Sequence, residues 1–588
     1  MAEQKPTTFG EEHLEYNQSS NGANNINNEK PVEAYDSHDS DTASGNSKPY
    51  VFNRQIALTL FVAYVAWFAD LFAVNTSSSI LANLNAHLGP QSTYTFIQLG
   101  QIGLLAFLGP IVGALSDTFG PRYLMLASNI FSILGAGLAG WAKDVNYAIA
   151  GAIIIGVGAS IHVQVWATLA ELVPKRFRPV AFGLFQLALA PGIAFSPVIA
   201  WAADLHGHWR WLFWFPFILY IIDIPLLALF YHPVSVRPPS TLSVAQRLAK
   251  FDWFGSFVWF AGIVLFVLGL TLGGNQFSWK SAVTLCLTLI GFVLLIFLGF
   301  FEAFAPLTLP LFPKKAFANL RGVTFVFWGL FFYCACEFAI NNLWGTQVQV
   351  LYTQTPLKIG WYTSAYSIPM VIFPLISGLS VYKFGYIHFQ YLFHIIAIVI
   401  CTCCMATVET ASAGGSTAMV VLAGGFVSSA WILTLIILQI EVGSAHIGWV
   451  TGLMYTVKNV GGAIGSTTYT NNLSARFVAA IPSKFALPLA ESGLDPTLIP
   501  AVLQALTSGA TTSPILAKLT PAQLGIAALG ITQSYAYAFK IVFLISIAYG
   551  ITGIFFTALT KPVQFTNEVD MQPASMRIKK IWRSSTAV

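Results

Sequence analysis

Six ionisable side chains lie inside long apolar runs of the sequence. Placing a charged side chain in the hydrocarbon of a membrane costs roughly 2.5–3.5 kcal/mol on insertion scales. Each such residue therefore needs a partner or a task, and in an apolar chain the tasks are proton transfer and binding of a polar ligand. The six residues are Asp70, His162, Asp223, Glu337, His394 and Lys458.

Glu337 is the first candidate for proton coupling. Tyr333, Glu337, Asn341 and Trp344 recur at helical spacing, so they share one face of a helix. A carboxylate, an amide and two aromatic rings suit the wall of a substrate cavity, where they would stack on an aromatic or terpenoid ligand and exchange a proton. The alternative is a structural hydrogen bond between helices.

Three residues in the first half of the chain are further candidates for proton coupling. Asp70 is one of them, with support of helix packing as the alternative. His162 titrates in the useful range and shares a helix face with Trp166, a cavity candidate, although many buried histidines are structural. Asp223 precedes Pro225, so the alternative is a bond to backbone groups that the proline frees.

Lys458 lies near the middle of an apolar run, with Tyr455 on the same face. Both are candidates for the substrate cavity. Lys458 could pair with Glu337, but the sequence leaves that pairing open. The alternative is a lysine that extends its side chain to the membrane surface.

The elements that must position these residues are membrane-spanning helices. Only 9% of the 588 residues are charged and 56% are hydrophobic, whereas a soluble domain has about 25% charged residues. Runs of about 20 apolar residues suffice to cross a bilayer. The pattern predicts an all-α polytopic membrane protein with fourteen spans, at about 55–78, 94–115, 123–142, 147–168, 180–201, 211–231, 253–273, 282–301, 322–346, 360–381, 389–408, 416–438, 447–470 and 540–560.

A turn that occurs twice predicts an internal repeat. The stretch "GALSDTFGPR", Gly113–Arg122, joins the second and third spans, and "GLSVYKFGY", Gly378–Tyr386, joins the tenth and eleventh. Two six-span bundles in parallel, with two extra spans between them, place both turns equivalently, as in secondary transporters. We expect Gly113, Asp117, Gly120 and Arg122 to form a gating turn in which Asp117 accepts hydrogen bonds from a neighbouring helix N-terminus.

Five segments follow from this repeat. The polar N-terminal residues lack a signal-peptide pattern and are expected to be disordered. Lys and Arg concentrate in the segments on the side of the N-terminus, which predicts that both termini are cytoplasmic. The segments are a disordered tail at 1–50, a six-helix bundle at 51–232, a linker with two inserted helices at 233–321, a second bundle at 322–565 that includes an extracellular loop at 474–538, and a cytoplasmic tail at 566–588.

Several function classes are excluded. The six cysteines lie in apolar runs without nearby histidine or acidic partners, so neither a metal site nor a disulfide framework is expected. No nucleotide-binding loop or nucleophile triad occurs, so the sequence predicts neither an enzyme nor a self-contained ATP-driven pump. We expect no cofactor and no nucleic acid; the partners are protons, the bilayer and a small molecule.

Five motifs resemble the major facilitator superfamily. Besides Gly113–Arg122, with Thr118 and Pro121 where basic residues are usual, they are "FADLFAVNTSSSIL" at 68–81, "HWRWLFWFPFIL" at 208–219, "FDWFGSFVWFAGIVLFVLGLTLGGNQFSW" at 251–279 and "VKNVGGAIGSTTYTNNL" at 457–473. Together with "ELVPKRFRPVAFG" at 171–183, they are most similar to the fourteen-span fungal group of trichothecene-efflux-type pumps. That group is related to drug:proton antiporters and siderophore transporters. Ala152 stands where antiporters of the drug type carry an arginine, and their span 5 signature is blurred to "LALAPGIAFSP".

The resemblance implies a proton-coupled secondary transporter that exports a small amphipathic organic compound by alternating access. The compound would be a fungal toxin, a secondary metabolite or a drug. The alternative is proton-coupled uptake of ferric siderophores. The resemblance further implies a monomer in the plasma membrane, with a vacuolar or endosomal membrane as the alternative.

Overall fold

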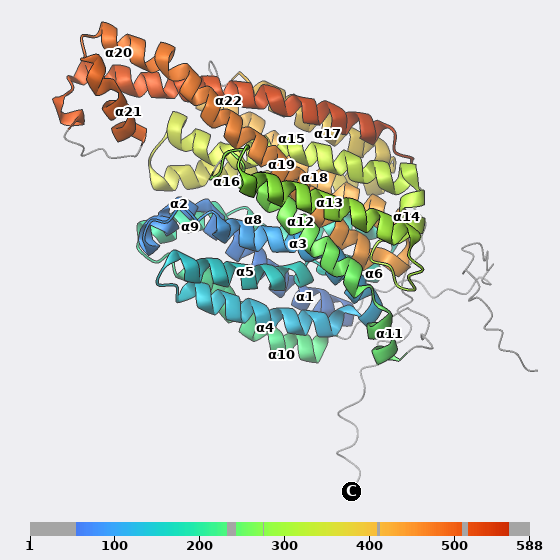
Figure 1. Ribbon diagram of the computed structural model, residues 1–588. Coiled ribbons are helices and arrows are strands. Elements are labelled where there is room, and N and C mark those ends of the chain that lie inside the picture. The colour runs from blue at the N-terminus through green and yellow to red at the C-terminus, as the bar shows by residue number, and fades with distance from the viewer. Residues whose placement is uncertain (1–53, 232–242, 275, 408–411, 508–514, 564–588) are drawn as a thin grey trace, which may run out of the picture. The chain divides into compact units, whose positions relative to one another are not determined.

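The computed structural model describes residues 54–231, 243–274, 276–407, 412–507 and 515–563. The N-terminal tail expected to be disordered, 1–50, and the cytoplasmic tail expected at 566–588 lie outside the described residues. Helices make up nearly all of the described chain, and they fall into two bundles with a helical pair inserted between them in sequence (Figure 1).

The first bundle extends from α1 to α10. Pro121 and Pro179 lie in the first turns of two of its helices. The backbone N–H that proline lacks would have no partner within the helix at these positions. The helices are α1 (Arg54–Ser79), α2 (Leu81–Leu88), α3 (Phe96–Phe119), α4 (Pro121–Gly140), α5 (Val145–His162), α6 (Val165–Leu172), α7 (Arg178–Ala188), α8 (Ala190–Ile193), α9 (Ser196–Leu205) and α10 (Trp211–Phe230).

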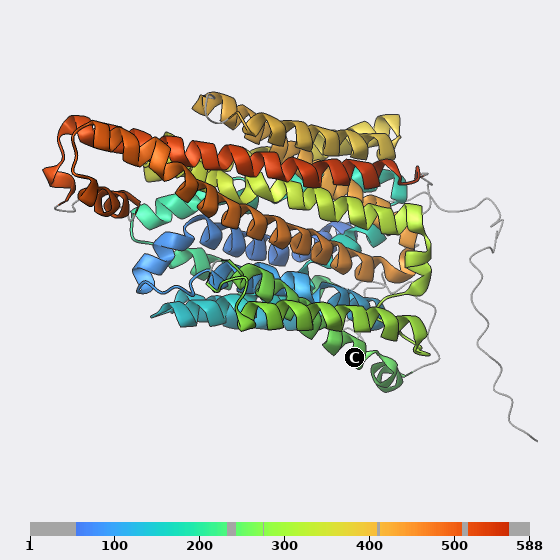
Figure 2. The same cartoon turned by 45° about the horizontal axis from the view of Figure 1, so that its top comes forward.

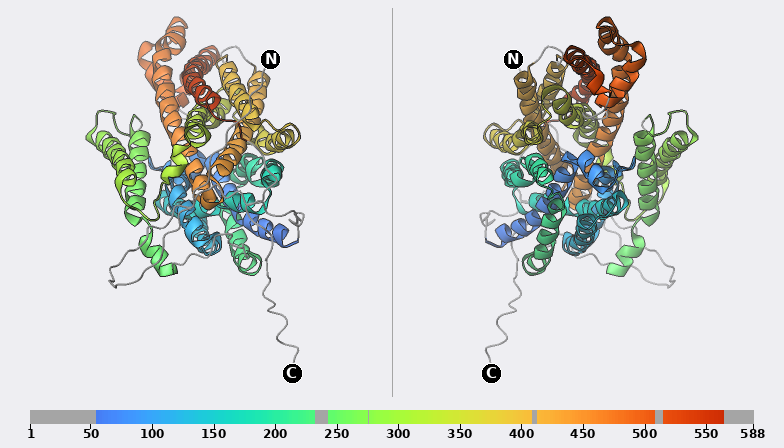
Figure 3. Two further views of the ribbon diagram at one scale, coloured as in Figure 1. Left: turned by 90° about the vertical axis from the view of Figure 1, so that its right-hand side faces the viewer. Right: turned by 90° about the vertical axis from the view of Figure 1, so that its left-hand side faces the viewer.

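The inserted pair lies beside the two bundles, as the view along the helices shows (Figure 3). Its long helices contact each other through glycines: a Cβ at Gly291 would meet the backbone of Phe266. The pair is preceded and followed by short helices, and its elements are α11 (Val244–Lys250), α12 (Trp253–Leu272), α13 (Ala282–Phe304) and α14 (Lys314–Ala318).

The second bundle contains the longest helices. A π-helical turn precedes α15 and another follows it. The helices are α15 (Phe325–Gln347), α16 (Pro356–Phe384), α17 (Ile387–Met405), α18 (Ala413–Val442), α19 (Ile447–Ile481), α20 (Leu487–Glu491), α21 (Ile499–Thr507) and α22 (Pro521–Ala558).

Twelve of the described helical segments are long and apolar enough to span a membrane, by length and composition. Two of the fourteen expected spans fall outside this set. The run expected at 180–201 is divided into α7, α8 and α9, with Pro191 and Pro197 each in the first turn of a new helix. The run expected at 447–470 lies in α19, which is continuous but more polar. The fourteen-span count therefore stays a prediction.

The outer loop expected at 474–538 is shorter at both ends. Helix α19 continues to Ile481, and α22 begins at Pro521 after a capping box formed by Thr520 and Gln523. Among the described residues of this segment, Pro482, Pro488 and Pro496 occupy first turns of helical elements, where proline is tolerated. Helices α20 and α21 lie at the end of the bundles opposite α11 and α14, and α22 extends toward them (Figures 1 and 2).

Candidate functional site

Asp70 lies in a buried network that three helices of the first bundle build. Its Oδ2 is 2.5 Å from Nδ1 of His162, and its Oδ1 accepts a hydrogen bond of 2.6 Å from the Tyr220 hydroxyl. Asp70 and His162 are each 1% exposed. Both carboxylate oxygens thus have partners on α5 and α10, while Nε2 of His162 has none.

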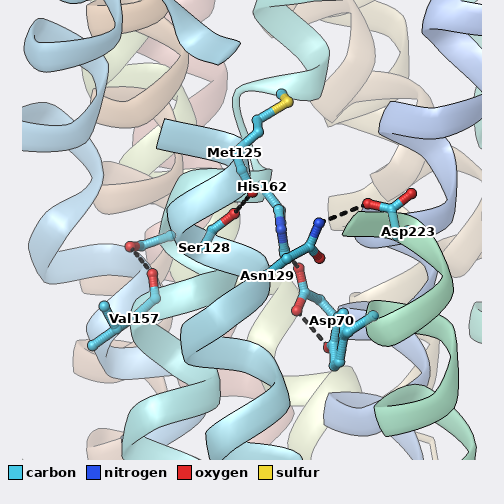
Figure 4. A network of polar contacts seen from close by, with 9 residues as sticks. Asp70, Met125, Ser128, Asn129, Val157, His162 and Asp223 are labelled. Atoms are coloured by element: carbon cyan, nitrogen blue, oxygen red, sulfur yellow. Dashed lines mark hydrogen bonds and ion pairs between the residues drawn. The ribbon is translucent and has the colours of Figure 1, made fainter. Parts of the chain in front are cut away.

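Asp223 lies in the same region, with its carboxylate bound to α4 (Figure 4). Its Oδ2 accepts a hydrogen bond of 2.8 Å from Nδ2 of Asn129. This hydrogen bond comes from a side chain, whereas the alternative expectation was a bond between Asp223 and backbone groups freed by Pro225. The imidazole of His162 stacks on the Tyr220 ring, with centroids 6.1 Å apart. Three of the expected proton-coupling residues are therefore gathered in one region of the first bundle.

Glu337 lies in the corresponding network of the second bundle. Its Oε1 accepts hydrogen bonds from the Tyr366 hydroxyl of α16 at 2.6 Å and from Nδ2 of Asn341 at 3.0 Å. Its Oε2 is buried and has no partner. The side chain is 2% exposed, so the expected proximity of Glu337 and Asn341 on one helix face is present as a direct bond.

Lys458 is half-buried on α19, and its Nζ lies 5.7 Å from the centre of the Trp431 ring. Among the described residues, no ion pair within 4 Å joins it to Glu337. The pairing that the sequence left open is therefore not a direct contact in this conformation.

Four aromatic side chains from both bundles meet beside Lys458. The rings of Trp166 and Trp431 have centroids 5.0 Å apart, and Tyr455 lies 5.4 Å from Trp431 and 6.0 Å from Trp67. We call Trp67, Trp166, Trp431 and Tyr455 the central aromatic cluster. Two of the expected cavity residues, Trp166 and Tyr455, belong to it.

The other two aromatic candidates contact helices of their own bundle. The Tyr333 ring lies against Tyr391 of α17, and the Trp344 indole donates a hydrogen bond of 2.7 Å to the Tyr362 carbonyl of α16. Both side chains are buried. Their role in a cavity stays a prediction.

The gating turn connects the two bundles. Asp117 accepts hydrogen bonds from the backbone N–H groups of Gly448 at 3.0 Å and Trp449 at 2.7 Å, at the N-terminus of α19. This is the interaction expected of Asp117, since the first N–H groups of a helix have no partner within it. Gly120, with φ of 90°, ends α3, and Arg122 donates a hydrogen bond of 3.0 Å to the Ala228 carbonyl of α10.

Both copies of the repeated turn contact the other bundle in the same way. A Cβ at Gly113 would meet the carbonyl of Gly448, the second residue of α19. A Cβ at Gly378 would meet the carbonyl of Pro179, the second residue of α7. Each turn therefore places a glycine of one bundle on the first turn of a helix of the other.

The sequence did not single out several aromatic and polar side chains that contact the candidate residues. These side chains are Trp67, Trp431, Tyr220, Tyr366 and Asn129. Trp67 lies one turn before Asp70 and Tyr220 one turn before Asp223, so helical spacing from the ionisable residues was an available signal. Among the described residues, no group of three His, Cys, Asp or Glu side chains is arranged to hold a metal ion.

The chain resembles known transporters over most of its length. The family model described as the fungal trichothecene efflux pump (TRI12) matches residues 40–570. The trichothecene efflux pump TRI12 of Trichoderma arundinaceum is 22% identical over 534 residues, covering 86% of this chain and 85% of the relative. The MFS-type efflux transporter ffsH of Aspergillus flavipes is 24% identical, covering 80% of each.

A solved structure shares the fold. The human organic anion transporter MFSD10 (TETRAN) superposes with a TM-score of 0.53 at 12% identity, covering 84% of this chain and 99% of the other. The all-helical architecture of this chain is thus shared with that transporter. With its family model matched over most of the sequence, the chain belongs to the fungal trichothecene efflux pump family and is a multi-pass membrane transporter of the major facilitator type, not an enzyme.

Proposed function

We propose that this protein exports a small amphipathic organic compound in exchange for protons, by alternating access. The observation that carries the proposal is the state of Glu337, a buried carboxylate with one oxygen bonded and the other without a partner. A proton can be added at Oε2 without breaking an existing hydrogen bond. Neutralising a buried charge in this way changes the free energy of one conformation relative to another.

Lys458 connects that proton to the substrate. The Lys458 ammonium interacts both with Glu337 and with the central aromatic cluster, so the ligand is bound while Glu337 is ionised and leaves when Glu337 is protonated. The exporter binds its substrate from the cytoplasm, opens outward, exchanges the substrate for a proton and returns. Because the proton and the substrate are bound alternately and not together, the transport is antiport.

The crossings between the bundles supply the moving parts. Asp117 and Gly113 hold α3 against the start of α19, and Gly378 holds α16 against the start of α7. Opening at this end must break the two Asp117 bonds and separate the glycine contacts. We assign this end to the cytoplasm, with both termini on that side, from the distribution of Lys and Arg.

The compound is proposed to be a fungal toxin, a secondary metabolite or a drug, handled by a monomer at the plasma membrane or, alternatively, at a vacuolar or endosomal membrane. Relatives named as trichothecene efflux pumps support export. The alternative of ferric-siderophore uptake lacks such support, but the same assay tests it.

The test is accumulation of labelled compounds in host cells with and without this chain, each with a protonophore control. Toxins and ferric siderophores are measured side by side. Lower toxin accumulation that the protonophore reverses supports proton-driven export. Higher accumulation of a ferric siderophore contradicts it and establishes uptake instead.

A further inference from the structure

The inserted helical pair buries two carboxyl groups at one end. Asp252 immediately precedes α12, and Glu302 lies in the last turn of α13; they are 6% and 5% exposed. Oδ2 of Asp252 and Oε2 of Glu302 are buried without a hydrogen-bond donor. The two side chains lie within hydrogen-bonding range of each other. Neither takes part in the exchange of substrate for protons proposed above.

The other oxygen of each carboxyl group holds the backbone around it. Oδ1 of Asp252 accepts a hydrogen bond of 2.8 Å from the N–H of Gly255, in the first turn of α12. Oε1 of Glu302 accepts from the N–H groups of Leu311 at 2.9 Å and Phe312 at 3.3 Å. The two groups thus join the start of α12, the end of α13 and the segment that leads to α14.

The charged groups on the adjoining elements leave the two carboxyl groups uncompensated. Arg247 donates to the Thr118 carbonyl of α3, and Lys314 donates to the Ala303 carbonyl, each at 2.8 Å. Among the described residues, no ion pair within 4 Å reaches Asp252 or Glu302. The charged or titratable groups on these elements are Asp117 of α3, Arg247 and Lys250 of α11, Lys314 and Lys315 of α14, and His446 just before α19.

We propose that Asp252 and Glu302 share one proton and form a second proton-binding site, outside the two bundles. Two carboxylates this close repel each other strongly when both are ionised, and burial removes the water that would screen them. One proton between Oδ2 and Oε2 replaces the repulsion with a hydrogen bond and supplies the donor that these oxygens lack. Its loss leaves two buried negative charges, which separate.

Phe312 connects this site to the crossing of α3 and α19. Its ring lies 5.0 Å from that of Trp259 on α12 and 6.3 Å from that of Trp449, the third residue of α19. The Trp449 N–H is bonded to Asp117. The Trp259 indole donates a hydrogen bond of 2.9 Å to the Phe107 carbonyl of α3. The inserted pair is therefore fastened to both helices of the crossing.

The shared proton makes this attachment sensitive to pH at the end of the molecule that we assign to the cytoplasm. At lower pH the proton holds Phe312 against Trp449 and supports the closed crossing. As the pH rises, the proton is lost, the carboxylates separate and the segment 305–313 loosens. In the antiporter proposed above, protons enter the cytoplasm, so the site would slow transport as the cytoplasm becomes acidic. That last consequence alone rests on the proposed function.

Backbone hydrogen exchange, measured by mass spectrometry on the full chain in lipid nanodiscs, tests the site without a proton gradient. Glu302→Gln keeps an oxygen for Leu311 and Phe312 and adds an N–H that donates to Asp252, so it retains the protonated arrangement at every pH. At about pH 8, the segment 305–313 should exchange about threefold to tenfold faster in the unsubstituted chain than in Glu302→Gln, and at about pH 6 the two should be equal. Comparing chains at one pH removes the intrinsic pH dependence of exchange. The first turn of α19 should show a smaller difference in the same direction.

A second buried substitution and an exposed one complete the set. Asp252→Asn keeps an oxygen for Gly255 and donates to Glu302, so it should behave like Glu302→Gln. Glu491→Gln is the control, because it removes an exposed carboxylate from α20, at the opposite end of the bundles (Figure 1). It should exchange like the unsubstituted chain. If one buried substitution prevents folding, the other still decides the result.

Equal exchange of the segment 305–313 in the unsubstituted chain and the buried variants at both pH values would overturn the proton site. The same slowing of exchange by Glu491→Gln would overturn it as well. A difference that does not reach α19 would overturn the link to the crossing. The difference should persist in a Glu337→Gln background, so a failure of proton coupling at Glu337 and a failure of this site are distinguishable.

Discussion

Each bundle buries one carboxylate that accepts a 2.6 Å hydrogen bond from a tyrosine, but the remaining partners differ. In the first bundle, the second oxygen of Asp70 faces the His162 imidazole. In the second, the second oxygen of Glu337 has no partner. A proton added at Asp70 Oδ2 enters a contact shared with His162, in which the donor depends on the imidazole tautomer, whereas a proton added at Glu337 Oε2 meets no existing partner.

The comparison indicates that similar surroundings serve two tasks. The Asp70–His162 pair ties α1 to α5, and together with Tyr220 it ties both to α10. It therefore suits a rigid element that holds the first bundle together. Glu337 is anchored through one oxygen only and suits proton exchange. Two of the substitutions below test this division of roles between Asp70 and Glu337. The other two test the contacts between the bundles.

Glu337→Gln should have the largest effect on function. The amide oxygen still accepts from Tyr366, so the variant should fold and insert, but it cannot release a proton. We expect export driven by an imposed pH gradient in proteoliposomes to fall to the level of protein-free vesicles. Counterflow exchange, which needs no net proton movement, should persist. Undiminished gradient-driven export would remove Glu337 from the mechanism.

Asp70→Asn should have the largest effect on stability. Removing one partner of a buried pair costs about 3–5 kcal/mol because the other is left without compensation. We expect a clear drop in the thermal unfolding temperature of the purified protein, partly recovered when His162→Gln is added. If Asp70→Asn instead keeps its stability and loses coupling, the comparison is reversed. The proton would then bind in the first bundle, with the unpartnered Nε2 of His162 as the second candidate.

Gly452→Ala should separate α3 from α19. A Cβ at this position would overlap the carbonyl of Gly109 on the facing helix. Overpacking of this kind costs about 1–3 kcal/mol. We expect lower thermal stability and slower transport, with Gly299→Ala as the control, since nothing lies within 4 Å of its Cβ position. Equal behaviour of the two variants would show that this crossing does not need close contact.

Much of the fold could be predicted from the sequence, because apolar runs and turns are local features. The turn predicted that Asp117 accepts hydrogen bonds from a neighbouring helix N-terminus, but that this helix belongs to the other bundle was not predicted. The breaks in α7–α9 and the helical segment after α19 could not be placed, since a proline inside a helix and a proline that begins one differ only in what precedes them.

The site was less accessible to sequence reasoning. Helical spacing placed Asn341 beside Glu337, because both lie on one helix. Tyr366 and Tyr220 come from other helices, and their approach to a carboxylate depends on how the helices cross. Trp67 could have been found from its helical spacing to Asp70, but its approach to Trp431 through Tyr455 depends on the contact between the bundles.

The smallest of the four effects is expected at the repeated turns. The comparison here is between the two places where these turns cross the other bundle, one on α3 and one on α16. At the α3 crossing, Asp117 accepts two backbone bonds from the start of α19. At the α16 crossing, the residue four positions after Gly378 is Tyr382, which stacks on Phe177 with centroids 5.4 Å apart. One crossing is held by charge and helix N–H groups, the other by ring contact.

Asp117→Asn keeps one acceptor oxygen but removes the negative charge, a change worth about 0.5–1 kcal/mol at a helix N-terminus. We expect a shift of about twofold to fivefold toward the state in which this crossing is open. The measurement is the labelling rate, by a maleimide added on the cytoplasmic side, of a cysteine introduced at the buried Ser116, with exposed Cys286, Cys403 and Cys404 replaced by serine. Tyr382→Phe keeps its ring and should leave the rate unchanged. A larger change in Tyr382→Phe than in Asp117→Asn would mean that the Tyr382 hydroxyl, and not the negative charge at the helix N-terminus, holds the cytoplasmic end closed.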